Sequence, residues 1–569
     1  MSEMITSFKV KEKQVDWNKV GMWSIIVLSV FRILLFTAVP YLIYGDAIID
    51  DALLVDEGRS IYNGDWLGTY NYMTLIKGSS FPLFLALIRL LCIPYSVALG
   101  VATVIAGLSF VWAFKDRIDK RWIWGMYLFI IYAPYTMSYY TTQRVYRNAL
   151  TPILTIIFFC LVTGICLRLI KTDKIKIRHI LILGFVFAFF TNLREDSTWI
   201  LPFLLVVELL ELGYLIIKKN WRYIILLAVP FLVLFGWNTG VSALNYHYYG
   251  LYTTNDRAGE NFGEMMGLLY SMEHEENNTD IWISKASMQE AIDASPSLQS
   301  IEEHIWNNYN GFRGADEQVI GDSMTWVMRF ALNDAGYYSD AVTANEFCGQ
   351  VVKELEAAYA DGTLTKQDGI YLSAQACALP SDEILPMIKQ SLKMSYEVAR
   401  YDILQLNENV PGTGSTEQIR SIESFTGCLG EYHVNQETGA VDQVTTDTHK
   451  IVKVLNILST IYHKISMLFV GVFILAYLYI VGYILYKRKQ VDFAILTTWV
   501  LMTGMLLSAF VLLFGTHFYL KHMEVLHAIP GVNINSLFAC GAYPLVQIAK
   551  YVIIYMAGKD ICRIIKSRI

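Results

Sequence analysis

Long apolar runs separated by short basic segments constrain this chain more than any other feature. A helix needs about 20 apolar residues to cross the hydrocarbon of a bilayer. Runs of that length, or close to it, lie at 22–44, 95–114, 122–138, 149–170, 179–193, 198–217, 222–240, 460–486, 492–515 and 534–557. Hydrophobic residues make up 54% of the 569 residues and charged residues only 17%, so the composition also indicates a polytopic membrane protein.

One further apolar stretch, at 80–93, is shorter than a span. It begins near Pro82, ends near Pro94 and carries Arg89. This length and these flanking residues favour an interfacial or re-entrant helix.

Basic residues predict which ends of the spans face the cytoplasm, because Lys and Arg gather on that side. With ten spans and 80–93 outside the bilayer, all the basic patches fall on one side, whereas an additional crossing would divide them. The patches are the N-terminal tail, 115–121, 171–178, 218–222, 487–489 and 559–568. We therefore expect both termini in the cytoplasm of a multi-pass cell-membrane protein. The segments expected outside are 45–94, 139–148, 192–197, 241–455 and 516–533.

The predicted fold is mainly α, with a large soluble insert between spans 7 and 8. Residues 1–240 would form a membrane module with the first outer loop, 241–455 an extracytoplasmic domain, and 456–569 the last three spans. Helical patterns in the insert cover 287–294, 297–307, 322–333, 341–360 and 384–401. The insert contains Cys348, Cys377 and Cys428, so at most one disulfide could form there.

The first outer loop begins with two carboxylates, Asp50 and Asp51, at the point where the first span ends. A carboxylate at that depth is partly desolvated and can act as a general base. The alternative is an acidic loop that only helps to define the topology. A second acidic pair, Asp56-Glu57, follows in the same loop.

The order of elements in this region resembles the C-type glycosyltransferase superfamily (GT-C), which includes protein O-mannosyltransferases and lipid A aminoarabinose transferases. The detailed match covers about residues 20–115. The family more often has Glu at the position of Asp51. Asp56-Glu57 is an alternative counterpart of the family's acidic pair, but its spacing to Gly64 is further from the family pattern. The matching elements are Asp50-Asp51, Gly64-Asp65-Trp66-Leu67, Lys77 and, as a second interfacial helix, 80–93.

The resemblance implies an inverting transfer of a sugar from a polyprenyl-phosphate donor at the outer leaflet to a cell-wall polymer, glycolipid or protein. Asp50 would remove a proton from the acceptor hydroxyl. The departing lipid phosphate needs cations rather than a strong acid, and Arg suits bidentate phosphate contact. The available outer cations are Lys77, Arg144, Arg147, Arg194 and Lys521.

Two of these cations have structural alternatives. Arg144 and Arg147 are flanked by tyrosines, which are routine at membrane interfaces, so the pair could anchor lipid headgroups. Arg194 precedes Glu195 and Asp196, so an internal ion pair could hold that hairpin together. If this hairpin is functional, Glu195 or Asp196 supplies a second acid that orients the acceptor or binds a divalent metal such as Mg or Mn.

Other function classes find less support in the sequence. The ionisable groups lie at the outer ends of spans, whereas transporters and flippases place them near the midplane. A non-catalytic envelope scaffold stays open, with the insert as its binding part. We expect the insert to select the acceptor or dock a partner. No motif indicates a nucleotide or nucleic acid, and no residue spacing indicates a metal; the histidines at 517, 522 and 527 do not align on one helical face.

Overall fold

The chain is mainly helical. The computed structural model describes residues 17–314, 316–402, 404–407, 412–428, 430, 448–487, 490–521 and 537–568. Within these ranges there are only isolated β-bridges and no strand. Seven helical segments in the same ranges are long and apolar enough to cross a bilayer, which supports a multi-pass membrane protein. They are Gly21–Ala38, Tyr95–Phe114, Arg147–Thr172, Ser197–Ile217, Trp221–Tyr249, Lys450–Lys487 and Phe493–Leu520.

The first part of the chain supplies most of the long helices, and two short helices, α2 and α3, lie between the first two of them. α3 has only 11 residues and is too short to cross, as expected for the stretch at 80–93. The elements are α1 (Trp17–Ala38), α2 (Asp51–Asn63), α3 (Ser80–Leu90), α4 (Tyr95–Phe114), α5 (Lys120–Ile131), η1 (Pro134–Thr136), α6 (Tyr139–Thr142), η2 (Arg147–Ala149), α7 (Thr151–Thr172), α8 (Ile177–Thr191), η3 (Ser197–Ile200), α9 (Leu201–Ile217), η4 (Trp221–Tyr223), α10 (Ile224–Leu227) and α11 (Val229–Tyr249).

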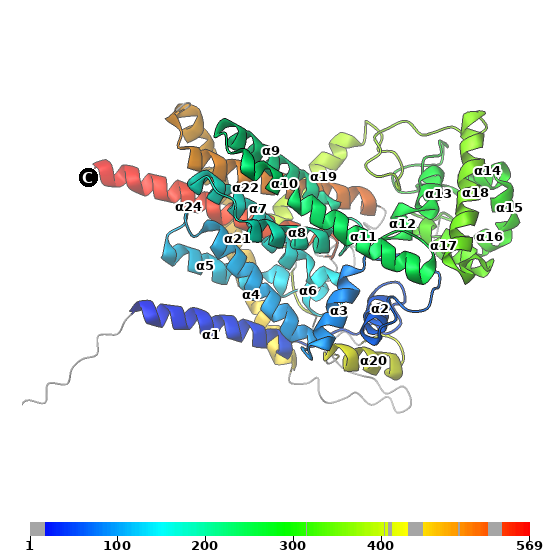
Figure 1. Ribbon diagram of the computed structural model, residues 1–569, viewed down its shortest axis with the longest axis horizontal. Coiled ribbons are helices and arrows are strands. Elements are labelled where there is room, and N and C mark those ends of the chain that lie inside the picture. The colour runs from blue at the N-terminus through cyan, green and yellow to red at the C-terminus, as the bar shows by residue number, and fades with distance from the viewer. Residues whose placement is uncertain are drawn as a thin grey trace, which may run out of the picture.

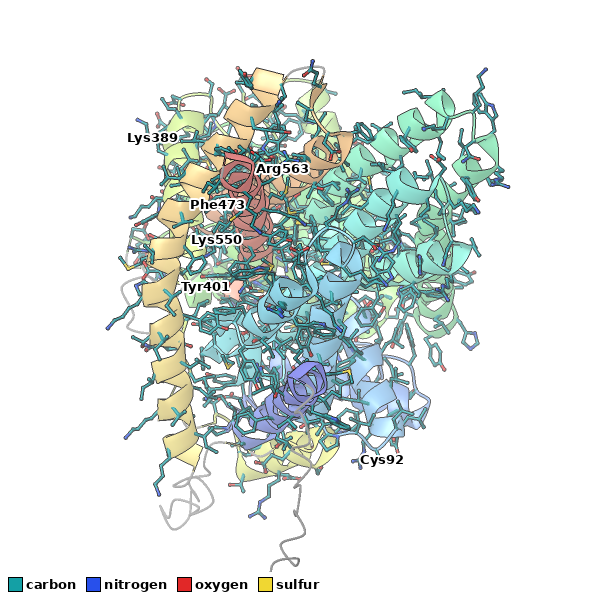
Figure 2. All side chains as sticks on the ribbon, turned by 90° about the vertical axis from the view of Figure 1, so that its left-hand side faces the viewer. Cys92, Lys389, Tyr401, Phe473, Lys550 and Arg563 are labelled. Carbon is teal, nitrogen blue, oxygen red and sulfur yellow. The ribbon has the colours of Figure 1, made fainter. Side chains whose placement is uncertain are left out.

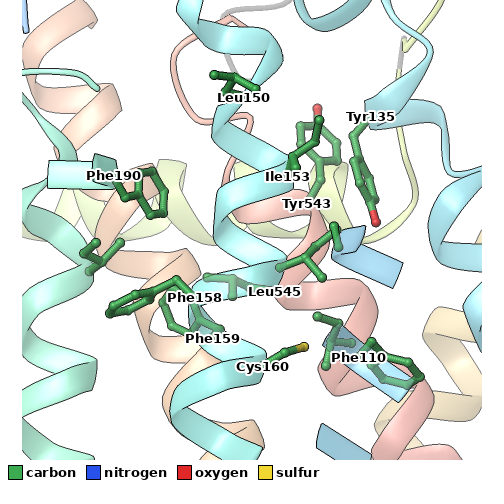
Figure 3. Packing of buried hydrophobic residues seen from close by; sticks show 14 of the residues in the cluster. Phe110, Tyr135, Leu150, Ile153, Phe158, Phe159, Cys160, Phe190, Tyr543 and Leu545 are labelled. Carbon is green, nitrogen blue, oxygen red and sulfur yellow. The ribbon is translucent and has the colours of Figure 1, made fainter. Parts of the chain in front are cut away.

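α7 is the central helix of this bundle. Its side chains are apolar on every side, a pattern typical of a helix surrounded by others. Phe158 and Phe159 are fully buried, and the cluster around them includes Phe110 from α4, Phe190 from α8 and Leu545 from the last helix (Figure 3). The loops at the end of α7 are therefore held on a rigid support.

The predicted span at 122–138 is shorter than expected, because α5 ends at Ile131 and the chain turns into η1. Arg32 in α1 explains how the backbone can leave the helix here. Its guanidinium, which is 1% exposed, donates to the carbonyl oxygens of Ile131 at 2.6 Å and Thr136 at 2.8 Å. Inside a bilayer, non-helical backbone is tolerated only where its polar groups find partners within the protein.

The insert contains helices close to those predicted, the longest with the same bounds. α11 continues to Tyr249, so the expected boundary at 240 falls inside a helix. The predicted helix at 297–307 is two helices, α15 and α16. The insert helices are α12 (Asp256–Gly259), α13 (Asn261–Tyr270), α14 (Lys285–Ala294), α15 (Pro296–Ser300), α16 (Glu302–Phe312), α17 (Ser323–Asp334), η5 (Tyr337–Ser339), α18 (Ala341–Ala360), α19 (Ile384–Ala399) and α20 (Thr416–Thr426).

The insert contributes to two hydrophobic cores. Residues from Phe262 to Met387 pack into a core of their own, which also includes Phe518. From Met394 onward, the buried residues of α19 and α20 join the core of the membrane helices. All eight cysteines are free. α2 and α3 lie between the long helices and the insert helices α13–α18 (Figure 1).

Three long helices complete the described structure: α21 (Thr448–Lys487), α22 (Phe493–Leu520) and α24 (Ala542–Arg568). α24 packs against both α21 and α22. Of the expected last span, 534–557, the first three residues lie outside the described ranges, and within these ranges α24 begins at Ala542.

Candidate functional site

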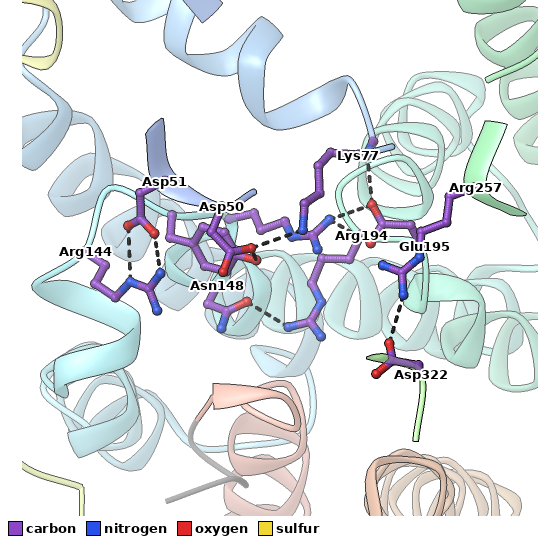
Figure 4. A network of polar contacts seen from close by, with 12 residues as sticks. Asp50, Asp51, Lys77, Arg144, Asn148, Arg194, Glu195, Arg257 and Asp322 are labelled. Atoms are coloured by element: carbon purple, nitrogen blue, oxygen red, sulfur yellow. Dashed lines mark hydrogen bonds and ion pairs between the residues drawn. The ribbon is translucent and has the colours of Figure 1, made fainter. Parts of the chain in front are cut away.

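Four segments that are distant in sequence meet in one polar network, which we call the acid–base network (Figure 4). They are the start of α2, the loop before α3, the segment from the loop after α6 through η2, and the hairpin between α8 and η3. The side chains that meet are Asp50, Asp51, Lys77, Arg144, Arg147, Asn148, Arg194, Glu195 and Asp196.

Asp50 pairs with a cation of the network and is also accessible to solvent. It occupies the N-cap position of α2, but its side chain does not cap the helix. Instead, Oδ1 accepts hydrogen bonds from Lys77 Nζ at 3.1 Å and from the Tyr146 hydroxyl at 3.0 Å. Burial would raise the pKa of Asp50, but the charge of Lys77 and of two nearby arginines lowers it to about 2. Its side chain is 42% exposed, so a reactant can reach it.

Asp51 forms a buried ion pair with Arg144. Arg144 donates from Nε to Oδ1 at 3.1 Å and from Nη2 to the second carboxylate oxygen. The Asp51 side chain is only 3% exposed, and this burial raises its pKa despite the neighbouring arginine. The pair fixes the loop between α6 and η2 against the start of α2 and leaves little access for a ligand.

Arg147 and Glu195 form a further ion pair between segments. Arg147 Nη1 donates to both carboxylate oxygens of Glu195, at 2.7 and 2.8 Å, and the backbone N–H of Gly78 donates to the same carboxylate at 3.1 Å. Burial would raise the pKa of Glu195, but the charges of Arg147 and Lys77 hold it well below its usual range. Arg147 Nε is buried and has no hydrogen-bond partner.

Arg194 pairs within its own hairpin. It donates to Asp196 at 2.9 and 2.7 Å, and to the side-chain oxygen of Asn148 at 2.7 Å. The internal ion pair considered for this hairpin is therefore present, and Asn148 links it to the loop that carries Arg147. The Asp196 side chain is 50% exposed.

Gly78 brings the loop before α3 into direct contact with the hairpin. A side chain at this position would overlap the carbonyl oxygen of Asn192, and the N–H of Ser80 donates to that same carbonyl at 3.2 Å. Gly64 has a different role, because it ends α2 in the left-handed region with φ of 88°. The backbone geometry thus favours glycine at both Gly64 and Gly78.

The two acids of the second pair, Asp56 and Glu57, face different ways. Asp56 pairs with Arg59 on the exposed side of α2. Glu57 is 3% exposed, and neither of its carboxylate oxygens has a hydrogen-bond partner. Burial raises the pKa of Glu57 to about 8, although Lys77 and Arg147 act in the opposite direction. At neutral pH this carboxyl is therefore mostly protonated.

Lys521 lies at the end of α22 and contacts the insert instead of the acid–base network. Its ammonium donates to the Thr279 hydroxyl at 2.7 Å and lies 3.5 Å from Glu383 and 3.8 Å from Asp280. His522 and His527 lie outside the described residues. Within the described ranges, no group of three His, Cys, Asp or Glu side chains is placed to hold a metal ion.

Three residues near the acids, Tyr146, Asn148 and Arg257, are not among the site residues predicted from the sequence. Tyr146 and Asn148 stand beside the predicted arginines, and their contacts arise only when the loops meet. Arg257 of the insert pairs with Asp322 at 2.9 Å and also lowers the pKa of Glu195 (Figure 4). A single arginine in the polar stretch between two long apolar helices gives no sequence signal that it will lie beside the hairpin that carries Glu195.

Comparison with known proteins identifies no relative. No family model matches the chain, and neither a curated protein nor a solved structure matches it.

Proposed function

We propose that the chain is an integral membrane glycosyltransferase that moves a sugar from a polyprenyl-phosphate donor to an extracytoplasmic acceptor. The observation that carries the proposal is that Asp50 pairs with Lys77 from one loop, while the charges of Arg144 and Arg147 from another segment also act on its carboxylate. A partly exposed carboxylate among buried cations is suited to the displacement of a phosphate by a hydroxyl.

The proposal includes a topology of ten spans. The seven long apolar segments are joined by the shorter α5 and α8 and by α24. Both termini then lie in the cytoplasm, the insert lies outside, and α2 and α3 rest at the outer interface. In this arrangement the acid–base network lies at the outer leaflet, where a lipid-linked sugar presents its phosphate.

Donor binding must displace carboxylates from cations. The four cations Lys77, Arg144, Arg147 and Arg194 are each paired with one of four carboxylates, so the resting network is close to neutral. Two donors are best placed for a phosphate. Lys77 has a flexible stem and a partly exposed partner, and Arg147 has an Nε with no partner.

Binding of the donor phosphate to Lys77 also makes Asp50 a stronger base. In the resting network the charge of Lys77 keeps Asp50 weakly basic. When the donor phosphate takes up Lys77, that attraction falls and the proton affinity of Asp50 rises. The oxygen of the acceptor hydroxyl then attacks the anomeric carbon of the sugar while Asp50 accepts the proton of that hydroxyl. The bond between the sugar and the phosphate breaks, and the anomeric configuration is inverted.

The insert is the proposed acceptor-binding part. Arg329, which is fully buried in the insert, donates to the carbonyl of Thr74 at 3.2 Å and to Asp256 at 2.8 Å. The backbone N–H of Asp256 in turn donates to the carbonyl of Leu75 at 3.0 Å. The insert therefore contacts the loop that carries Lys77, and an acceptor held between them would lie beside Asp50.

The test is a transfer assay with a panel of radiolabelled polyprenyl-phosphate sugars and the purified full-length protein. Asp50→Asn should reduce transfer by about 10²–10⁴-fold, the usual contribution of a general base, while binding of polyprenyl phosphate is kept. Glu346→Gln, which neutralises an exposed acid on α18, is the control. Full turnover by Asp50→Asn would refute the base assignment, and no transfer by the wild type from any donor would refute the function.

A further inference from the structure

A large cavity lies among the membrane helices, distinct from the acid–base network. It has a volume of about 1140 Å³ and lies between α5, α21, α22 and α24. This exceeds the volume of about 300–1,000 Å³ that is usual for pockets of small molecules. Most of its wall is apolar, and the apolar lining includes Met126, Phe129, Ile465, Phe469, Val552 and Ile554.

One end of the cavity is lined by both acidic and basic side chains, some of which pair with one another. Lys559 lies 3.2 Å from Asp119, and Arg563 lies 2.6 Å from Asp560. These residues belong to segments that the distribution of basic residues assigns to the cytoplasmic side. The charges at this end therefore largely neutralise one another.

The other end of the cavity contains a lysine with no acidic partner. Lys550 is 1% exposed and lies on α24 nine residues before Lys559, about 14 Å along the helix. Its ammonium donates to the carbonyl of Ala399 at 2.9 Å and to the Ser466 hydroxyl at 2.6 Å, and it lies 5.1 Å from the centre of the Tyr401 ring. No carboxylate in the part of the chain that is described pairs with it. Figure 2 shows Lys550 close to Tyr401.

Among the described residues, this arrangement leaves one donor of the Lys550 ammonium group without an acceptor. An ammonium group has three protons to donate, and the two oxygens account for two of them. An ionisable residue within a membrane segment is costly unless it is paired, and its electrostatic attraction to an anion is large where the dielectric constant is low.

We propose that the cavity binds an anionic amphiphile from the membrane, whose acidic group pairs with Lys550 and whose hydrocarbon chain lies along the apolar wall. The wall excludes a small hydrophilic anion as the best ligand, because it would leave most of the cavity surface without apolar contact. The site goes beyond the transfer reaction and does not depend on it.

The experiment uses the full-length protein in nanodiscs of zwitterionic lipid. A palmitic acid that carries a diazirine in mid-chain is activated by light, and labelled peptides are identified by mass spectrometry. We expect saturable labelling of α5, α21 and α24. Unlabelled palmitic acid should compete at least tenfold better than its methyl ester, which has the same chain but no charge. Dodecyl phosphate as a second competitor shows whether the site prefers a phosphate or a carboxylate.

Substitutions of Lys550 test whether its charge contributes to binding of the acid. Lys550→Gln should weaken competition by palmitic acid about tenfold, as expected for the loss of one charge-assisted hydrogen bond. Lys550→Arg should retain most of it. Lys389→Gln removes the same charge from an exposed position on α19 and should change nothing.

A second route does not touch Lys550, which also holds α19 through Ala399. Gly125 lines the cavity, and no atom lies within 4 Å of where its side chain would begin. Gly125→Phe should fill the space and abolish labelling, whereas Gly213→Phe, at an equally open position on α9, should not. Equal competition by the acid and its ester, or full labelling of Gly125→Phe, would overturn the proposal.

Discussion

Glu57 offers a stability measurement whose size follows from its surroundings. Its carboxyl group is buried without a hydrogen-bond partner, and its pKa is raised from 4.5 to about 8. In the unfolded chain the proton leaves near pH 4.5, whereas the folded protein keeps it until about pH 8. Between these values the folded state binds more protons, so the stability of the wild type falls as pH rises.

The expected loss of stability is set by the difference between the pKa of Glu57 in the folded protein and in the unfolded chain. A difference of about 3.5 pKa units, at about 1.4 kcal/mol per unit, corresponds to roughly 5 kcal/mol lost by the time the pH passes 8. Glu57→Gln replaces the protonated acid with a neutral group of the same shape and has no such loss. We expect the variant to match the wild type near pH 4.5 and to be more stable by several kcal/mol at pH 9.

The assay is thermal unfolding of purified wild type and variant in the same detergent at pH 5, 7 and 9. Other titrating groups cancel in the difference between the two proteins. Glu346→Gln, at an exposed position, should give a small difference that does not change with pH. A Glu57→Gln difference that is the same at pH 5 and pH 9 would refute the assignment of a buried, protonated carboxyl.

Three further substitutions test the framework of the site and of the bundle by thermal unfolding. Asp51→Asn should cost about 3–5 kcal/mol, because it leaves the buried Arg144 without its carboxylate; removing both charges should cost less than the sum of the single changes. Gly78→Ala should cost about 1–3 kcal/mol through overlap with Asn192, and an unchanged unfolding temperature would contradict that close approach. Arg32→Met should cost about 1–3 kcal/mol for each carbonyl left without a donor, and a neutral effect would mean that the end of α5 has another source of hydrogen bonds.

The helices of the insert illustrate how far local patterns predict structure. The helix predicted at 341–360 has those bounds, and Asp340 caps it through the N–H of Thr343. The helix predicted at 297–307 is divided at Ile301, where buried side chains on both sides of the break pack into the insert core. Local propensity can locate a helix, but packing with distant residues decides whether it continues.

In the candidate site, too, local sequence predicts some features and contacts between distant residues decide others. The individual acids and cations could be selected from the sequence because charge beside hydrocarbon is costly and therefore conspicuous. Their pairing could not, because it depends on how the loops meet. Lys521 is one of the predicted outer cations, but it contacts the insert. Glu57 is buried and its neighbour Asp56 is exposed, because they face different sides of α2.

By itself the sequence determined a helical membrane protein with a polar insert, because the length of an apolar run and the period of a helix are local properties. Only the tertiary structure decided that Arg32 ends α5, that Asp50 faces Lys77, and that Lys550 lies at the end of a cavity. These contacts join residues from different helices, and the energy of a buried charge depends on the partners that the fold brings to it.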